Sequence, residues 1–243
     1  MARPRAIARA LTHDTPALLL RRINYGESDL VLTLFTAKLG RVSALARAAR
    51  KSHKRFAGAL EPLHTLRTRL DERAGAELFV LSEASILVPR RRLTGELDLM
   101  QAGGRALGWV RSAAPPRTPE PAVWKVLNHG LDRLDAGGTS PGAATHLAEL
   151  GLRLLAAFGW GLELERCVRC GKSCEQRRPA FVDAARGGLV CRSCGGARSR
   201  LEGSTRERLA RAVEGEGGSL LPEDAEIALE LVEQALKTHA GIE

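Results

Sequence analysis

The sequence predicts a multidomain protein of the α+β class: a small N-terminal β-barrel, then an α-helical domain with an inserted four-cysteine ribbon. Three observations predict this fold. Apolar and polar residues alternate, as they do in strands, through much of residues 25–88. Apolar residues follow helical spacing after residue 93. Two Cys-x-x-Cys pairs stand between two of the expected helices.

The alternation is clearest in residues 29–36, where Leu30, Leu32 and Leu34 share one face of a strand. Residues 36–40 form a turn in which Gly40 can take a positive φ, and residues 42–46 then restart the alternation as the second strand of a hairpin. Before this hairpin, two short apolar runs, residues 6–11 and 17–22, flank a turn-like spacer at residues 13–16.

A second hairpin is expected where residues 66–70 and 77–81 flank the turn at residues 71–75. Five or six short strands that close on themselves are typical of an OB-like barrel, the commonest architecture of this size that binds nucleic acid. We therefore assign residues 1–88 to an OB-like nucleic-acid-binding barrel.

Helical spacing predicts five helices, and a proline-rich break at residues 113–121 separates the first two. Gly159 ends the third helix, and Gly241 follows the fifth. We assign residues 89–243 to a helical domain with a zinc-ribbon insert at 163–203. The five helices are expected at residues 93–110, 122–134, 143–158, 204–213 and 222–240.

The positive charge is concentrated in the N-terminal part. The whole chain has a formal net charge of +9, but residues 1–92 carry 18 Lys and Arg against 8 Asp and Glu, while residues 93–243 carry 19 against 20. A basic loop joined to a sheet favours a polyanion as the ligand, although a solvated surface run has the same composition. The predicted phosphate contacts are Arg47, Arg50, Lys51, Lys54 and Arg55, close to His53, with Arg21, Arg22 and Arg41 as supporting charges.

Four cysteines have the spacing of a metal site: Cys167 and Cys170 form one pair, and Cys191 and Cys194 form the other. Each pair can bind a tetrahedral ion from a tight turn, which predicts one structural Zn²⁺ per chain with no position left for a catalytic water. Cys174 is either a spare thiol or a rival ligand for Cys170, and the sequence leaves this open. The insert carries nine Lys and Arg against five acids, so it could add to the anion-binding surface.

No catalytic motif is evident: the six histidines are scattered, and there is no Walker A loop, dinucleotide fingerprint or nucleophile elbow. We therefore predict a binding protein rather than an enzyme. The basic N-terminus lacks a signal-peptide core, and no apolar run could span a bilayer. The expected location is cytoplasmic, where the cysteines stay reduced.

The stretch Tyr25-Gly-Glu-Ser-Asp-Leu, then Leu39-Gly-Arg-Val-Ser-Ala-Leu-Ala-Arg and Arg55-Phe-Ala-Gly-Ala-Leu-Glu-Pro, resembles the N-terminal domain of the bacterial DNA repair protein RecO family. The order of barrel, helices and four-cysteine ribbon is similar as well. This resemblance implies a recombination mediator of the RecF pathway, associated with the nucleoid. Such a protein binds single- and double-stranded DNA, anneals strands, binds the acidic tail of single-stranded-DNA-binding protein, and with RecR helps to load RecA.

An acidic tail would need an apolar groove with a basic rim, and the apolar stripes of residues 143–158 and 222–240 could supply one. The candidate rim charges are Arg133, Arg153, Arg206 and Arg208. Two other functions stay open. One is a zinc-ribbon nucleic-acid adaptor in transcription or RNA metabolism, which would bind RNA at least as well as DNA. The other is a nucleic-acid-processing enzyme with an unrecognised site.

Overall fold

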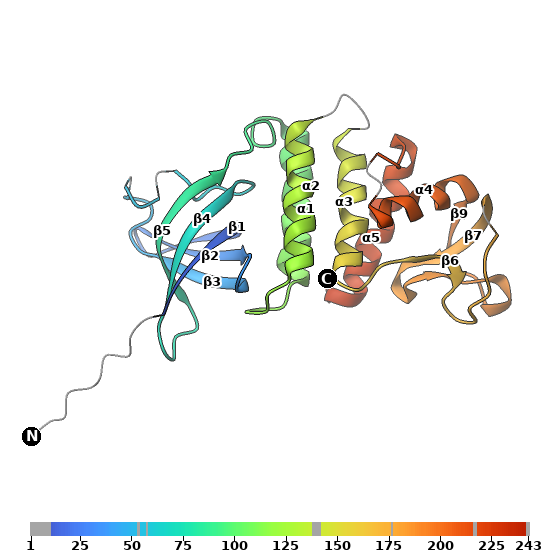
Figure 1. Ribbon diagram of the computed structural model, residues 1–243, viewed down its shortest axis with the longest axis horizontal. Coiled ribbons are helices and arrows are strands. Elements are labelled where there is room, and N and C mark those ends of the chain that lie inside the picture. Colours follow the sequence, from blue (N-terminus) through green and yellow to red (C-terminus); the bar gives the residue numbers. More distant parts are fainter. Residues whose placement is uncertain are drawn as a thin grey trace, which may run out of the picture. The chain divides into compact units, whose positions relative to one another are not determined.

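The chain forms two compact units (Figure 1). The computed structural model describes residues 11–52, 54–56, 58–137, 142–175, 177–215 and 218–241. The first unit comprises the described residues up to Arg90 together with Ala114–Pro121. The second unit comprises Arg91–Ala113 and the described residues from Ala122 onward.

The first unit is a closed five-stranded barrel with the strand order β1-β2-β3-β5-β4 (Figure 1). Strand β1 closes the barrel by pairing with β2 on one side and with β4 on the other. All pairs are antiparallel except the short parallel contact between β3 and β5. The predicted OB-like barrel is confirmed, with the strands β1 (Leu11–Tyr25), β2 (Asp29–Thr36), β3 (Gly40–Ala46), β4 (Thr65–Glu72) and β5 (Phe79–Val88).

The barrel interior is apolar, as the alternation predicted. Leu32 and Leu34 are 0% exposed and Leu30 is 7% exposed, so the face assigned to them is the buried one. Full burial of one such side chain contributes about 1.5–3 kcal/mol. Gly40 takes a φ of +67° in the turn between β2 and β3, as expected. The barrel therefore has an apolar core of its own, and exposed loops connect its strands.

The predicted spacer at residues 13–16 is wrong. These residues lie inside β1, which runs without interruption through Pro16 and pairs with β4 from Leu11 to Leu18. Pairing of β1 with β2 begins only at Ala17. Pro16 has no N–H to donate, and it lies where β1 has a ladder on one side only, the position that proline tolerates in a sheet. Of the expected first run, residues 6–10 lie outside the described residues.

The proline-rich break belongs to the barrel unit, where Arg117 anchors it. The Arg117 N–H donates to the Arg41 carbonyl at 2.8 Å, and its guanidinium donates to Glu72 Oε1 at 2.9 Å. The same guanidinium lies 4.8 Å from the centroid of the Phe79 ring. A segment that prolines exclude from helix is thereby fixed to the outside of the barrel.

The second unit contains five α-helices within its described residues, at or near the predicted positions. Pro222–Asp224 is a 3₁₀ turn, so the last helix begins three residues later than predicted. Helix α3 packs closely against its neighbours: a Cβ on Gly151 would lie 2.9 Å from Val232 of α5 and 3.0 Å from Trp109 of α1. The helices are α1 (Leu97–Ala113), α2 (Pro121–Ala136), α3 (Ala143–Ala157), α4 (Gly203–Glu214) and α5 (Ala225–Ala240).

Between α3 and α4 the chain forms a small four-stranded sheet, the ribbon, in the order β6-β8-β7-β9. Helix α4 holds this ribbon through Arg206, which is 5% exposed and donates to the carbonyls of Leu164 and Glu175. None of the described helices is long and apolar enough to cross a membrane. The ribbon strands are β6 (Glu163–Cys167), β7 (Arg177–Asp183), β8 (Gly188–Leu189) and β9 (Ser199–Glu202).

Candidate nucleic-acid interface and metal centre

The basic loop, residues 47–55, follows β3 and is fixed by the turn between β1 and β2. Asp29 Oδ1 accepts a hydrogen bond from the Ala48 N–H at 2.7 Å. The Ser28 carbonyl accepts from the Arg50 N–H at 3.0 Å, and the Glu27 carbonyl accepts from the Arg50 guanidinium at 3.3 Å. An acidic residue, Asp29, thus orders the backbone of a basic loop.

The cations of this loop face solvent without acidic partners. Among the described residues, no carboxylate lies within ion-pair distance of Arg47, Arg50, Lys51, Lys54 or Arg55, and all five side chains are exposed. Arg55 donates to the Arg47 carbonyl at 2.7 Å, which holds the two ends of the loop together. His53 lies outside the described residues. An ordered loop with uncompensated cations suits the binding of phosphates.

The supporting charges differ from one another in availability. Arg21 is exposed, whereas Arg22 donates to Glu61 Oε1 at 2.6 Å. Arg41 is half-buried and its Nε donates to the Ala114 carbonyl at 2.7 Å, so it fastens the proline-rich segment to the barrel. Arg90 is only 1% exposed and donates to the Leu63 carbonyl and to Thr65. The number of basic residues in this part of the sequence is therefore larger than the number that a polyanion can reach.

Beside the basic loop, the barrel carries a groove of about 470 Å³. The groove is lined by Arg22, Arg50, Asn24 from the end of β1 and Ser52 from the loop. Phe56 contributes an apolar part of the lining. Sequence reasoning missed Asn24 and Ser52, because only the β1–β2 pairing brings residue 24 next to the loop. The one sign of these two residues in the sequence is that each is polar and stands close to basic residues.

The four predicted metal ligands come together in the ribbon. The Sγ atoms of Cys167, Cys170, Cys191 and Cys194 all lie within 4.8 Å of one another, and those of Cys170 and Cys191 are 3.7 Å apart. Tetrahedral coordination with Zn–S bonds of about 2.3 Å places sulfurs about 3.8 Å apart. Gly171 and Gly195 take φ values of +72° and +103°, which lets each pair turn back tightly. The donor set and its spacing fit a closed four-thiolate site.

Hydrogen bonds prepare some of these thiols for deprotonation. The Cys191 N–H donates to Cys167 Sγ at 3.4 Å and lowers the pKa of Cys167 to about 6. The Ser193 hydroxyl lies 3.1 Å from Cys191 Sγ and lowers the pKa of that thiol. Hydrogen bonding with Cys191 and Cys170 raises the pKa of Cys194 to about 12. Thiolates are the form that binds a metal ion.

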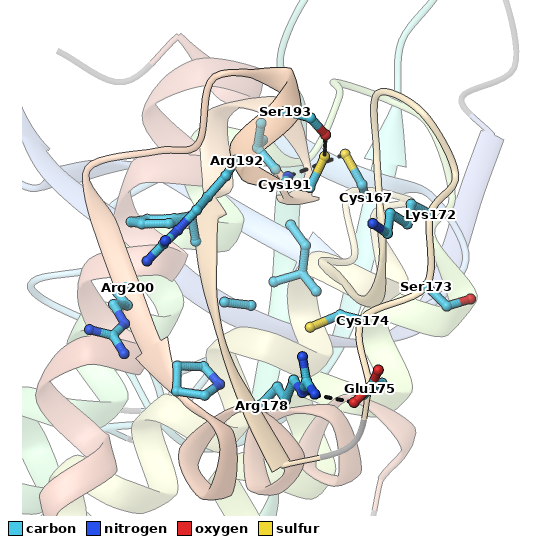
Figure 2. A pocket seen from close by; sticks show the side chains of 15 residues that line it. Cys167, Lys172, Ser173, Cys174, Glu175, Arg178, Cys191, Arg192, Ser193 and Arg200 are labelled. Carbon is cyan, nitrogen blue, oxygen red and sulfur yellow. Dashed lines mark hydrogen bonds and ion pairs between the residues drawn. The ribbon is translucent and has the colours of Figure 1, made fainter.

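Cys174 is not part of the cluster. Its backbone N–H donates to the Glu165 carbonyl, and its side chain lies on the wall of a neighbouring groove (Figure 2). The alternative in which Cys174 replaces Cys170 is therefore not the arrangement seen among the described residues.

The predicted basic rim on the helices is wrong for three of its four members. Arg133 pairs with the buried Glu149 at 3.0 Å, Arg206 is buried against the ribbon, and Arg208 pairs with the buried Asp224 at 2.6 Å. These arginines stabilise the fold. Only Arg153, which is half-buried, has no ion-pair partner among the described residues.

Together these features define a class of protein: a closed OB-like barrel with an exposed basic loop, followed by a helical unit that carries a four-cysteine ribbon. Residues 11–90 match the family described as Recombination protein O N terminal, and residues 97–243 match Recombination protein O C terminal. The chain belongs to the RecO family.

Relatives that match most of this chain are named DNA repair protein RecO. This chain is 40% identical over 177 residues to the DNA repair protein RecO of Anaeromyxobacter sp. (strain K), and the match covers 73% of this chain and 68% of the relative. The DNA repair protein RecO of Geobacter sulfurreducens is 34% identical over 226 residues, covering 92% of this chain and 90% of the relative. For the protein of the same name from Myxococcus xanthus, the identity is 36% over 183 residues, covering 75% and 72%.

Proposed function

We propose that this protein is a DNA repair and recombination mediator that binds single- and double-stranded DNA, promotes strand annealing and, with RecR, helps to load RecA in the RecF pathway. The observation that carries this proposal is the basic loop: five exposed cations that have no acidic partner in the described part of the chain, on a loop ordered by Asp29. Family membership supports the repair role. The action is binding, not catalysis, and its setting is the cytoplasm at the nucleoid.

Annealing requires that phosphates be neutralised while the base edges stay free for pairing. The basic loop suits the first requirement, since its long cationic side chains can reach phosphates without sequence-specific geometry. Exposed aromatic residues are scarce near it: Tyr25 at the end of β1 is 60% exposed, but Phe35, Phe56 and Phe79 are each at most 2% exposed. A platform that stacks and covers the bases is therefore poorly supplied on the barrel.

The ribbon holds one Zn²⁺ per chain in this proposal, with Cys167, Cys170, Cys191 and Cys194 as ligands. The ion supplies structure alone, because four thiolates fill its coordination sphere. Partner contacts with RecR and with the acidic tail of single-stranded-DNA-binding protein are part of the proposal through the family. RecA is reached indirectly, and no membrane contact is involved.

The salt dependence of DNA binding tests the role of the basic loop. Replacing Arg50, Lys51 and Lys54 by Ala should weaken binding to all sequences alike and reduce the slope of log K against log salt by about one unit for each lost contact. The matched control removes Lys38, Arg67 and Arg73, three exposed cations of the same unit outside the loop. An unchanged slope in the loop variant, or an equal change in the control, would overturn the assignment.

A further inference from the structure

The ribbon contains a groove of about 620 Å³ on the side of the sheet next to the cysteine cluster (Figure 2). Its volume lies within the range of sites that hold a small ligand or part of a larger one. It is lined by the apolar side chains of Phe181 from β7, Leu189 from β8 and Val190, the residue after β8. The DNA-binding proposal for the basic loop makes no use of this groove, which lies in the other unit.

The groove is rimmed by cations. Figure 2 shows Arg192 and Arg200 on one side and Lys172 on the other, with Arg178 toward one end. Among the described residues that line the groove, Glu175 is the one acid, and it pairs with Arg178 at 2.7 Å. Within the described part of the chain, Lys172 and Arg192 have no carboxylate partner. A net positive rim around an apolar lining suits a ligand that is anionic at its edge and flat and apolar in its body.

Arg192 and Phe181 form a stacking pair at this site. The Arg192 guanidinium carbon lies 5.7 Å from the centroid of the half-buried Phe181 ring. On the same ring, Gly196 approaches so closely that a Cβ there would lie 3.6 Å from ring carbons. Guanidinium planes and aromatic rings are the groups on which unpaired bases stack, and they do so without regard to base identity.

We propose that the ribbon groove binds one nucleotide of a single strand, with its base against the Arg192–Phe181 pair and its phosphates at Lys172 and Arg192. This inference rests on the proposed DNA-binding function and adds a second contact in a different unit of the chain. One nucleotide held in this way leaves the base edges of its neighbours free, so it is compatible with annealing.

The groove shares a wall with the cysteine cluster, since Cys167 and Cys191 belong to both. Ser193, another lining residue, lies 3.1 Å from Cys191 through its hydroxyl. A ribbon whose four cysteines are bound in place therefore presents Arg192 and Ser193 from an ordered turn. The metal content of every variant should be measured beside its DNA binding.

The test uses the full-length protein and an oligonucleotide with a single 2-aminopurine, whose fluorescence falls when the base stacks. Wild-type protein should quench the probe. Phe181→Leu should lose most of the quenching while its salt slope stays the same, and Arg192→Lys, which keeps the charge but not the plane, should behave likewise. Lys172→Ala with Arg192→Ala should also lower the slope, by about 0.7 for each lost contact to a single strand.

Arg198→Ala is the matched control, because Arg198 is an exposed cation of the same insert that does not line the groove. It should keep both quenching and slope. Unchanged quenching in Phe181→Leu and Arg192→Lys, with metal retained, would overturn the groove proposal. It would also be overturned if these variants lost binding of an acidic peptide but kept binding of the single strand. The loop variant separates the two proposals: if its slope falls while the ribbon variants are silent, the basic loop stands and the groove does not.

Discussion

The barrel and the ribbon are both basic, but different forces hold them together. The barrel closes around its own apolar core, in which Leu32, Leu34 and Leu66 are fully buried. The ribbon spans 41 residues and buries few large apolar side chains, among them Leu164, Val182 and Leu201. Domains of about 40 residues or fewer usually need a metal or disulfides to fold. We therefore expect the barrel's order to be intrinsic and the ribbon's order to depend on its four cysteines and on Arg206 from α4.

Metal removal should separate these two regions most strongly. Chelation, or Cys191→Ser, should loosen the ribbon strands while the barrel keeps its protection from amide hydrogen exchange, because structural zinc contributes about 10–16 kcal/mol to small metal sites. Cys174→Ala is the matched control and should retain the metal and the exchange pattern. Zinc that survives Cys170→Ala but is lost in Cys174→Ala would contradict the ligand set.

The turn between α4 and α5 should be sensitive to acid through Asp224, which is 1% exposed. Burial alone would raise the pKa of Asp224, but hydrogen bonds from Arg208 and from the Leu221 N–H outweigh it and hold the pKa below its ordinary value of 3.8. Because the folded pKa is depressed, its contribution to stability is complete above the unfolded pKa and is lost as pH falls through the folded value.

Asp224→Asn should therefore cost about 3–5 kcal/mol of unfolding free energy at pH 7, since it leaves Arg208 without its charged partner. The difference from wild type should narrow below about pH 4. Denaturant unfolding at several pH values measures both effects. A penalty that stays constant down to pH 2 would show that Asp224 acts through packing instead of charge.

The basic loop allows a smaller but sharper test at Asp29, where charge and order make opposite predictions. Asp29→Asn removes a negative charge yet keeps the oxygen that accepts from the Ala48 N–H, so DNA should bind somewhat more tightly. Asp29→Ala removes the same charge and also the acceptor, at a cost of about 1 kcal/mol in stability. If loop order matters, the Ala variant binds DNA less tightly than the Asn variant. Equal affinities would mean that net charge alone governs binding.

Local patterns predicted the parts of the fold that local forces determine. The alternation through Leu30, Leu32 and Leu34 located β2, and the spacing of the two cysteine pairs located the four-cysteine cluster. The spacer at residues 13–16 failed because the proline signal is local, whereas its tolerance in β1 depends on which sides of the strand are paired. The burial of Arg90 and Arg206 and the pairing of Arg208 with buried Asp224 were also hidden, because a charge has no periodicity that separates an internal partner from solvent.

In the proposed function, the barrel's basic loop brings DNA strands together by neutralising their phosphates. Annealing of complementary oligonucleotides, bare and coated with single-stranded-DNA-binding protein, is the decisive measurement. Wild-type protein should speed annealing of both substrates, and the variant lacking Arg50, Lys51 and Lys54 should lose most of that acceleration at low salt. Wild-type protein that leaves bare strands annealing at their spontaneous rate, or a loop variant as fast as wild type, would contradict the claim.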